Sequence, residues 1–410
     1  MIWWLSAALC LAQEAAGGAG AVAGGESRST STSRSKSTSK STSTTEVGGG
    51  QAQPGGEWKQ ALPGWVYEFP RDHGPHPEFK TEWWYTTGNL ATADGQRFGY
   101  QLTLFRQGLR PPGVPAGGRS RFLVDAFVFG HMAVSDPKRG RFYFSQKLSR
   151  GAFGEAGFSA GPRLGWVEDW SVELVGADGL RLRGRSEEAS LDLELELSKP
   201  WVAHGRDGIS PKAEGDGHAS HYYSGTRMRT RGVVRVEGRE EAVEGESWFD
   251  HEWASNQLAP GQVGWNWLSL QLSDGSELML YQMRRADGSV DPGSNGTLVA
   301  PDGSSRFLKL EAFDMQPRRY WTSPRNGARY PVGWKVRLPE WDLELEVSTP
   351  LENQELAIPP VSYWEGMVEA RGRRAGKPLE GRGYLELTGY AGALVGLSEP
   401  GAGAKSERVR

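Results

Sequence analysis

Three ionisable residues stand side by side in Asp250-His251-Glu252, and Trp253 follows them. In a β-strand successive side chains point to opposite faces, so Asp250 and Glu252 would share one face and His251 would lie on the other. A carboxyl group that faces an apolar cavity has a raised pKa, which suits a general acid near neutral pH. The alternative is a solvated strand end with local salt bridges. We therefore take Asp250, with His251 as its partner, as the first catalytic candidate.

A second group lies earlier in the chain, where Glu82 follows a loop that contains His73 and His76. The carboxyl group of Glu82 is a second candidate for the acid, and it could instead form an ion pair with Arg106 on a neighbouring strand. The His-x-x-His spacing also occurs in metal sites, but alone, in a loop rich in glycine and proline, it is weak evidence for one. We expect no metal ion here.

A third group combines polar, aromatic and cationic side chains, among them Lys212, Tyr222 and Tyr223. Such groups can transfer protons, although they would equally suit a polar loop that leads into a strand. All 7 histidines, including His131, lie between residues 73 and 251 and none follows, so the later part of the chain, which repeats the earlier part, has none; this favours a functional role for some of them. The sequence has no G-x-S-x-G elbow, P-loop or G-x-G-x-x-G motif, so we expect neither a common serine hydrolase nor a nucleotide cofactor.

Aromatic residues could line a site near these groups, because the chain has 17 tryptophans. Alternation along a strand would place Trp83 and Tyr85 on one face and Trp84 on the other. Trp265 and Trp267 repeat this spacing later in the chain. The rings could simply fill a core, but bulk on both faces of one strand favours an aromatic-lined cavity or a domain interface. Rings beside a carboxylic acid would also stabilise a cationic intermediate.

Short β-strands must position all of these residues. From Trp58 onward no long segment has helical periodicity, whereas segments such as 99–105, 191–197 and 343–347 alternate strictly between apolar and polar residues. Asp-Gly turn signals separate such segments, and the chain contains 56 glycines and 24 prolines. Strands at this spacing predict an all-β fold, either a sandwich or a barrel.

The chain also repeats itself in order. Trp83-Trp84-Tyr85 corresponds to Trp265-Asn266-Trp267, LELELSKP to LELEVSTP, and EGESWFD, which ends at Asp250, to EGRGYLE, which ends at Glu386. We therefore divide the fold near residue 258 into an N-terminal domain, 58–258, and a C-terminal domain, 259–392, with a tail at 393–410. A barrel of about eight strands can hold one small ligand, so we expect a ligand site inside the barrel-like halves.

The N-terminal sequence predicts export. Residues 1–16 form a short apolar segment like the core of a signal peptide, and residues 17–57 form a Ser/Thr/Gly linker that we expect to be disordered. This tether would bring the protein near a membrane, and we expect a periplasmic or extracellular location. The formal net charge of −3 gives no basic surface for nucleic acid. We expect a monomer.

Several motifs together resemble a known family. They are Asp72-His73-x-x-His76-Pro77, Thr81-Glu82-Trp83-Trp84-Tyr85, Phe98-Gly99-Tyr100-Gln101, Trp248-x-Asp250-His251-Glu252-Trp253, Gly264-Trp265-x-Trp267, Tyr363-Trp364-Glu365-Gly366 and Gly383-Tyr384-x-Glu386. The chain is similar to the secreted-hydrolase-like, AttH-type group, which belongs with the lipocalin-like carotenoid 1,2-hydratases. The resemblance implies two tandem lipocalin-like antiparallel β-barrel domains and a pocket for an apolar isoprenoid- or polyketide-like molecule.

The resemblance also implies hydration or cyclisation as the chemistry. The hydratases carry an Asp-His-x-Trp motif, which Asp250, His251 and Trp253 match. They also carry a Tyr-x-Asp motif on a following strand, where this chain has Tyr281 but Met283 in place of the Asp.

Our leading hypothesis is proton-assisted addition or cyclisation, with Asp250 or Glu82 as the acid, His251 as its partner, and no cofactor. Trp253, Trp265 and Tyr281 would shape the pocket. We expect further substrate contacts from Trp83, Tyr85, Arg106, His131, Lys212, Tyr222, Tyr223 and Trp267. Two alternatives stay open. They are a non-catalytic carrier of lipophilic ligands, which the missing Asp favours, and a hydrolase of ester or glycosidic bonds.

Overall fold

The computed structural model describes residues 56–115, 124–206, 208–358 and 362–392. The predicted signal segment, nearly all of the predicted linker and the predicted tail lie outside these ranges. Within them, helical structure is limited to four single 3₁₀ turns, η1 (Arg71–His73), η2 (Ala152–Gly154), η3 (Leu310–Ala312) and η4 (Pro339–Trp341). No helix in these ranges has the length and apolar character that a membrane span requires.

The first sheet contains thirteen strands. They are β1 (Thr81–Ala91), β2 (Arg97–Gly108), β3 (Ala126–Asp136), β4 (Arg141–Ser149), β5 (Ala156–Phe158), β6 (Arg163–Val167), β7 (Trp170–Val175), β8 (Gly179–Arg185), β9 (Ala189–Leu197), β10 (Val202–Ala203), β11 (Ile209–Pro211), β12 (Ala219–Val236) and β13 (Arg239–Ala254). Their main order is β4-β3-β2-β1-β13-β12-β9-β8-β7-β6-β5, and every pairing is antiparallel.

The second sheet contains ten strands. They are β14 (Gln262–Leu272), β15 (Glu277–Arg285), β16 (Asn295–Val299), β17 (Ser305–Lys309), β18 (Asp314–Thr322), β19 (Arg329–Leu338), β20 (Leu343–Ser348), β21 (Glu355–Leu356), β22 (Tyr363–Arg374) and β23 (Lys377–Leu387). The main order is β17-β16-β15-β14-β23-β22-β20-β19-β18. In each sheet the first strand of the domain therefore pairs with the last.

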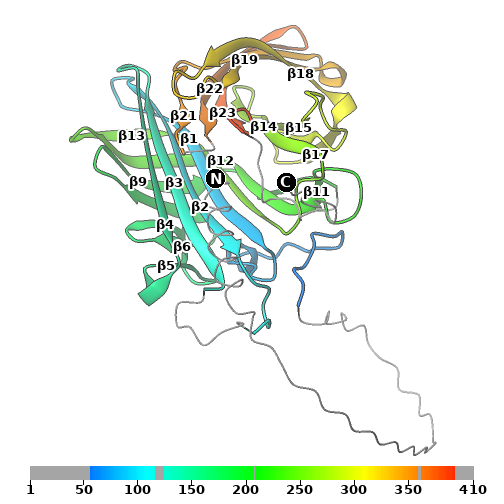
Figure 1. The fold of residues 1–410 in the computed structure, drawn as a ribbon. Coiled ribbons are helices and arrows are strands. Elements are labelled where there is room, and N and C mark those ends of the chain that lie inside the picture. Colours follow the sequence, from blue (N-terminus) through cyan, green and yellow to red (C-terminus); the bar gives the residue numbers. More distant parts are fainter. Residues whose placement is uncertain (1–55, 116–123, 207, 359–361, 393–410) are drawn as a thin grey trace, which may run out of the picture.

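Alternation along the strands explains how each sheet encloses a core. In β9, Leu191, Leu193 and Leu195 are buried, while Asp192 and Glu194 between them are exposed. The two sheets curl separately, and Figure 1 shows the second (light green through yellow to red) beside the long strands of the first (blue to green). The predicted all-β fold with two tandem lipocalin-like domains is confirmed.

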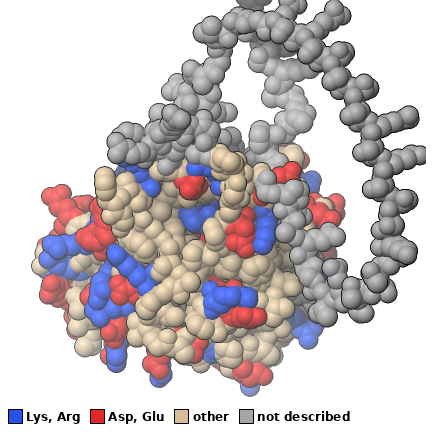
Figure 2. All heavy atoms as spheres, turned by 90° about the horizontal axis from the view of Figure 1, so that it is seen from below, with Lys and Arg blue, Asp and Glu red and all other residues tan. Residues whose placement is uncertain are grey.

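The central strands of the two domains pack against each other and are buried on both faces. This explains why β1 has almost no exposed position, unlike β9. An apolar cluster that includes Tyr85, Tyr222, Trp267 and Met367 joins the domains, apart from the core inside each sheet. Elsewhere the surface is mixed in charge, and Figure 2 shows cationic and anionic side chains next to one another on the face in view.

Candidate functional site

A cavity with an empty volume of about 690 Å³, partly open to solvent, lies between the two domains. This location differs from our expectation of a ligand site inside the barrels. The interior of the first sheet is filled by large buried side chains such as Trp84 and Trp170, whereas the facing outer surfaces of the two sheets leave space between them.

The cavity wall combines aromatic and apolar side chains with a small number of buried polar groups. The first domain and the segment after it contribute Trp83, Tyr85, Gln101, Phe105, Lys212, Tyr222, Asp250, Glu252, Gln257 and Leu258. The second domain contributes Trp265, Trp267, Tyr281, Met283, Tyr363, Glu365 and Glu386. Both domains are therefore needed to form the site.

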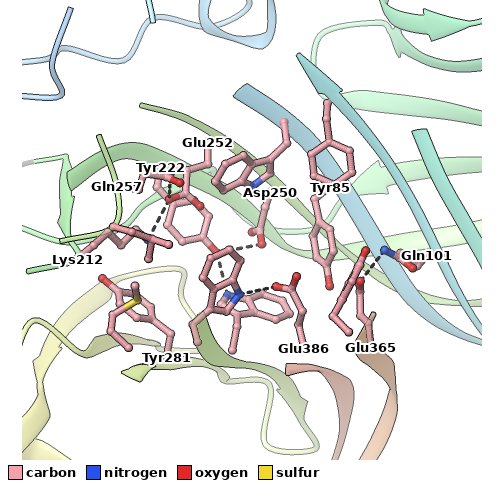
Figure 3. Close-up of a pocket in the computed structure, with 17 residues that line it drawn as sticks. Tyr85, Gln101, Lys212, Tyr222, Asp250, Glu252, Gln257, Tyr281, Glu365 and Glu386 are labelled. Atoms are coloured by element: carbon pink, nitrogen blue, oxygen red, sulfur yellow. Dashed lines mark hydrogen bonds and ion pairs between the residues drawn. The ribbon is translucent and has the colours of Figure 1, made fainter. Parts of the chain in front are cut away.

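Asp250, on β13, projects into this cavity from the first domain (Figure 3). Its side chain accepts hydrogen bonds from Tyr222 Oη at 2.9 Å, from Trp248 Nε1 at 2.6 Å and from the Ser224 hydroxyl. Burial raises the pKa of Asp250 to about 7, even though these hydrogen bonds lower it. Near neutral pH this carboxyl group can therefore exist in both its protonated and its ionised form.

A chain of hydrogen bonds runs from Asp250 to the second domain. Ser224 Oγ lies 2.6 Å from His204 Nε2, and His204 Nδ1 lies 2.8 Å from Thr297 Oγ1 on β16. Burial lowers the pKa of His204 to about 3, so its imidazole is neutral. A neutral imidazole has one donor nitrogen and one acceptor nitrogen, so His204 can donate a hydrogen bond to one of its two neighbours and accept one from the other.

Glu386, on β23, is the counterpart of Asp250 in the second domain. Asp250 pairs with Tyr85 across β13 and β1, and Glu386 pairs with Trp267 across β23 and β14. Trp265 Nε1 donates to Glu386 Oε2 at 2.8 Å. Burial raises the pKa of Glu386 to about 7. The repeat in the sequence thus places two equivalent carboxyl groups in one cavity, and Figure 3 shows them projecting from opposite sheets.

Glu365, on β22, lies beside Glu386 across the β22–β23 ladder. Gln101 Nε2 donates to Glu365 Oε2 at 2.6 Å, across the domain boundary. Burial, followed by the charge of Glu386, raises the pKa of Glu365 well above its ordinary value. Burial therefore favours the protonated form of Glu365.

Lys212 and Glu252 form an ion pair in another part of the wall, with Nζ and Oε1 2.9 Å apart. Burial lowers the pKa of Lys212, but Glu252, Tyr281 and Asp250 together outweigh this effect and the pKa is raised. The ammonium group lies 4.3 Å from the ring centroid of Tyr281. This lysine carries its charge within an ion pair and adds a cation–π contact.

Six of the residues predicted from the sequence do not line the cavity. Glu82, Arg106, Tyr223, His251 and Trp253 lie in the interior of the first domain, and His131 lies behind the wall, with its Nδ1 2.9 Å from Tyr363 Oη. The cause is strand alternation, because His251 and Trp253 point away from the face that carries Asp250 and Glu252. His251 therefore does not contact Asp250 as its partner.

The side chain of Glu82 is held as a carboxylate. Its Oε2 accepts from Arg106 Nε at 3.0 Å, and its Oε1 lies 3.0 Å from His251 Nε2 and 2.7 Å from His76 Nδ1. Burial raises its pKa, but these hydrogen bonds and the guanidinium charge hold the pKa well below its ordinary value. This environment disfavours Glu82 as a proton donor at neutral pH.

His76, Glu82 and His251 also bring their potential metal-ligand atoms within 4.8 Å of one another. The guanidinium group of Arg106 contacts the same carboxylate, and both histidines are already hydrogen-bonded to it. A metal cation would have to replace the contacts of the histidines with Glu82, and it would lie beside the positive charge of Arg106. The arrangement therefore fits a buried hydrogen-bond network better than a metal centre.

The sequence argument missed several residues of the cavity wall. Glu386 could have been found, because the repeat aligns it with Asp250. Gln101 and Glu365 carried no such signal, since their relevance depends on how the two domains pack. Glu252 was not missed, because alternation already placed it on the same face of the strand as Asp250, and both side chains line the cavity.

Comparisons with known proteins agree with this architecture. The family model described as AttH-like matches residues 60–390. A solved structure described as an AttH from Nitrosomonas europaea has 35% sequence identity and a TM-score of 0.72, covering 81% of this chain and 99% of that chain. Kievitone hydratase from Nectria haematococca has 16% identity and a TM-score of 0.61, covering 80% of this chain and 93% of that chain. No curated protein matches this chain in sequence.

The second of these similarities shows the fold alone, because its sequence identity is low. The match to the family model covers most of the chain, and the structure from Nitrosomonas europaea is similar over nearly its whole length. The resemblance inferred from the motifs is therefore confirmed, and the chain belongs to the AttH-like family.

Proposed function

We propose that the protein binds an apolar, unsaturated small molecule between its two domains and transfers a proton to it, so that the molecule is hydrated or cyclised. The observation that carries this proposal is the placement of Asp250, whose pKa is about 7, in a cavity lined by aromatic rings. A general acid is most effective when its pKa lies near the working pH. The similarity in fold to a hydratase is consistent with this chemistry.

In the proposed reaction, the Asp250 carboxyl group donates its proton to one carbon of a double bond. The π electrons form the new C–H bond, and the other carbon becomes a cation. The faces of Trp83, Trp265 and Trp267 can stabilise this charge through their ring quadrupoles. The product depends on whether water or a second double bond of the substrate reaches the cation first.

Glu386, in its ionised form, is the proposed proton acceptor. In hydration, the oxygen of a water molecule bonds to the cation and one of its protons passes to Glu386, which gives an alcohol. In cyclisation, a second double bond attacks the cation, and loss of a proton to Glu386 restores a double bond. Asp250 ends as a carboxylate and Glu386 as an acid, and proton exchange with water restores both groups.

This assignment differs from the motif of the resembled hydratases at one position. Met283 stands where their Tyr-x-Asp motif has an Asp, and it lines the cavity. The proposal therefore depends on Asp250 and Glu386 for the two carboxyl groups. Tyr281, which donates its hydroxyl to the Pro211 carbonyl, supports the wall.

Turnover tests this proposal. The full chain is incubated with a panel of isoprenoid and polyketide-like alkenes, and the products are identified by mass spectrometry. We expect a hydrated or cyclised product from the wild type and from the surface control Asp192→Asn, and none from Asp250→Asn. Release of every bound ligand unchanged would favour a carrier, and cleavage of chromogenic esters or glycosides would favour a hydrolase.

A further inference from the structure

Three buried polar atoms gather at one end of the cavity and make no hydrogen bond of good geometry to the described residues, although the Tyr85 and Glu365 side chains lie close enough to interact with each other. They are Tyr85 Oη, Gln101 Oε1 and Glu365 Oε1. All three side chains line the cavity, and the exposed fraction of Gln101 and of Glu365 is 1%. Figure 3 shows Tyr85, Gln101 and Glu365 on the same side of the space between the domains. We refer to these three residues as the polar end of the cavity.

A buried polar atom without a hydrogen-bond partner lowers the stability of the folded protein. A buried donor or acceptor without a partner costs about 1–3 kcal/mol, and native proteins rarely leave several together. The polar end is also built across the domain boundary, because Tyr85 and Gln101 belong to β1 and β2 and Glu365 belongs to β22. Such a cluster suits a binding site whose missing partner is part of the ligand.

The chemistry of the three groups limits what that partner can be. The Tyr85 hydroxyl and the protonated Glu365 carboxyl can each donate a hydrogen bond, and the free Gln101 oxygen can accept one, since its amide nitrogen already donates to Glu365. Burial raises the pKa of both Tyr85 and Glu365 well above the ordinary values, which favours the protonated form of each group. A ligand hydroxyl group, which accepts and donates, would satisfy such a set.

We propose that the polar end recognises an uncharged hydroxyl group on an otherwise apolar ligand. This inference rests on the proposed function for the location of the ligand, and it narrows the substrate class from hydrocarbons to hydroxylated compounds such as terpenoid alcohols and phenols. A pure hydrocarbon would bury the three polar atoms without partners. Asp250, at a separate position in the wall, remains available to protonate a double bond.

A cationic ligand is the main competitor, because carboxyl groups and aromatic rings can also bind an ammonium group. To pair with it, Glu365 would have to ionise beside Glu386 in a buried position, and the ammonium would have to lose its own hydration. The desolvation of both charges opposes such a complex. We therefore favour the uncharged ligand.

Matched probes separate these possibilities. Isothermal titration calorimetry on the full chain compares geraniol, the corresponding deoxygenated hydrocarbon and geranylamine, which share one carbon skeleton. We expect geraniol to bind about fivefold to tenfold more tightly than the hydrocarbon, as one or two net hydrogen bonds would give. Tighter binding of the amine, equal affinities, or no binding of any probe would overturn the inference.

The variant Tyr85→Phe tests the polar end itself. It removes one unpartnered hydroxyl and should leave the melting temperature unchanged or slightly higher, while the preference for geraniol over the hydrocarbon falls about threefold or more. The control is Tyr143→Phe, which removes a tyrosine hydroxyl in the first domain, away from the cavity, and should keep the preference. A preference that survives in Tyr85→Phe would contradict the inference.

Binding and chemistry can fail separately in these experiments. Asp250→Asn should lose turnover but keep the preference for geraniol, since Asp250 is not part of the polar end. If the wild type prefers geraniol and never forms a product from any alkene, the proposed function is wrong and the recognition site stands. If products form but the affinities are equal, the polar end has been misassigned.

Discussion

Asp250 and Glu82 are both buried acids, but their surroundings act on them in opposite directions. Glu82 contacts a guanidinium group and two imidazoles, and its pKa is lowered. Asp250 has neutral hydrogen-bond donors only, so burial dominates and its pKa rises to about 7. Asp250 is therefore suited to donate a proton and Glu82 to form an ion pair, and their surroundings, not their residue types, make this difference.

The raised pKa of Asp250 makes stability depend on pH. Its folded-state pKa of about 7 exceeds the ordinary value of 3.8, so the folded state binds the proton more tightly and loses stability as pH rises between these values. Asp250→Asn cannot ionise. We expect its free energy of unfolding, relative to the wild type, to increase by up to a few kcal/mol between about pH 4 and pH 8. Denaturant titrations across pH measure this, and parallel stability curves would contradict the raised pKa.

Glu82→Gln should destabilise the protein, in contrast to Asp250→Asn. Removing the carboxylate leaves the buried guanidinium of Arg106 without its charged partner, so we expect a loss of about 3–5 kcal/mol in the free energy of unfolding. The affinity of the cavity for geraniol should stay within about twofold of the wild type, because Glu82 does not line it. Lost binding in a folded Glu82→Gln protein would show that the network acts on the ligand site.

At the scale of the element, successive side chains of β1 alternate between two faces. One face packs in the core of the first domain, and the other lines the cavity. Trp84 is fully buried in the core of the first domain, whereas Trp83 faces the cavity. We expect Trp84→Ala to lower the free energy of unfolding by about 3–5 kcal/mol, and Trp83→Ala to lower it less. Ligand affinity should fall more in Trp83→Ala than in any folded Trp84 variant, such as Trp84→Phe. Calorimetry and denaturant unfolding of the variants measure both effects, and the reverse pattern would contradict this assignment.

The sequence predicted the faces of these strands but not what each face would contact. Alternation correctly separated Trp83 and Tyr85 from Trp84, and Asp250 from His251. Periodicity identifies which side chains share a face, whereas the partner of that face depends on tertiary packing. For this reason the ligand site was expected inside the barrels, with a domain interface only as an alternative place for the aromatic residues.

At the scale of the whole molecule, the cavity exists only while the domains stay together. Glu277 of the second domain is fully buried, and its Oε1 lies 2.6 Å from Arg227 Nε and 2.8 Å from Lys199 Nζ of the first domain. The two-domain fold followed from the repeat and the family motifs, but these cross-domain contacts link positions far apart in the sequence. No local pattern marks them, and they appear only in the folded structure.

Glu277→Gln should weaken this junction. It leaves two largely buried cations without their shared carboxylate, so we expect a loss of about 3–5 kcal/mol in the free energy of unfolding and weaker ligand binding. The control is Glu369→Gln, which breaks a more exposed ion pair between the domains, with Arg97, and should cost about 1 kcal/mol or less. Equal effects of both variants on denaturant unfolding would argue against a special role for Glu277.

The most direct test of the central claim follows a proton from solvent to carbon. The full chain is incubated in deuterium oxide with isoprenoid and phenolic alkenes, and the recovered compounds are analysed by mass spectrometry and NMR. Hydration and cyclisation by Asp250 both predict a product with a deuteron bonded to carbon, formed by the wild type and not by Asp250→Asn. Recovery of each compound without carbon-bound deuterium, or equal labelling by Asp250→Asn, would contradict the account.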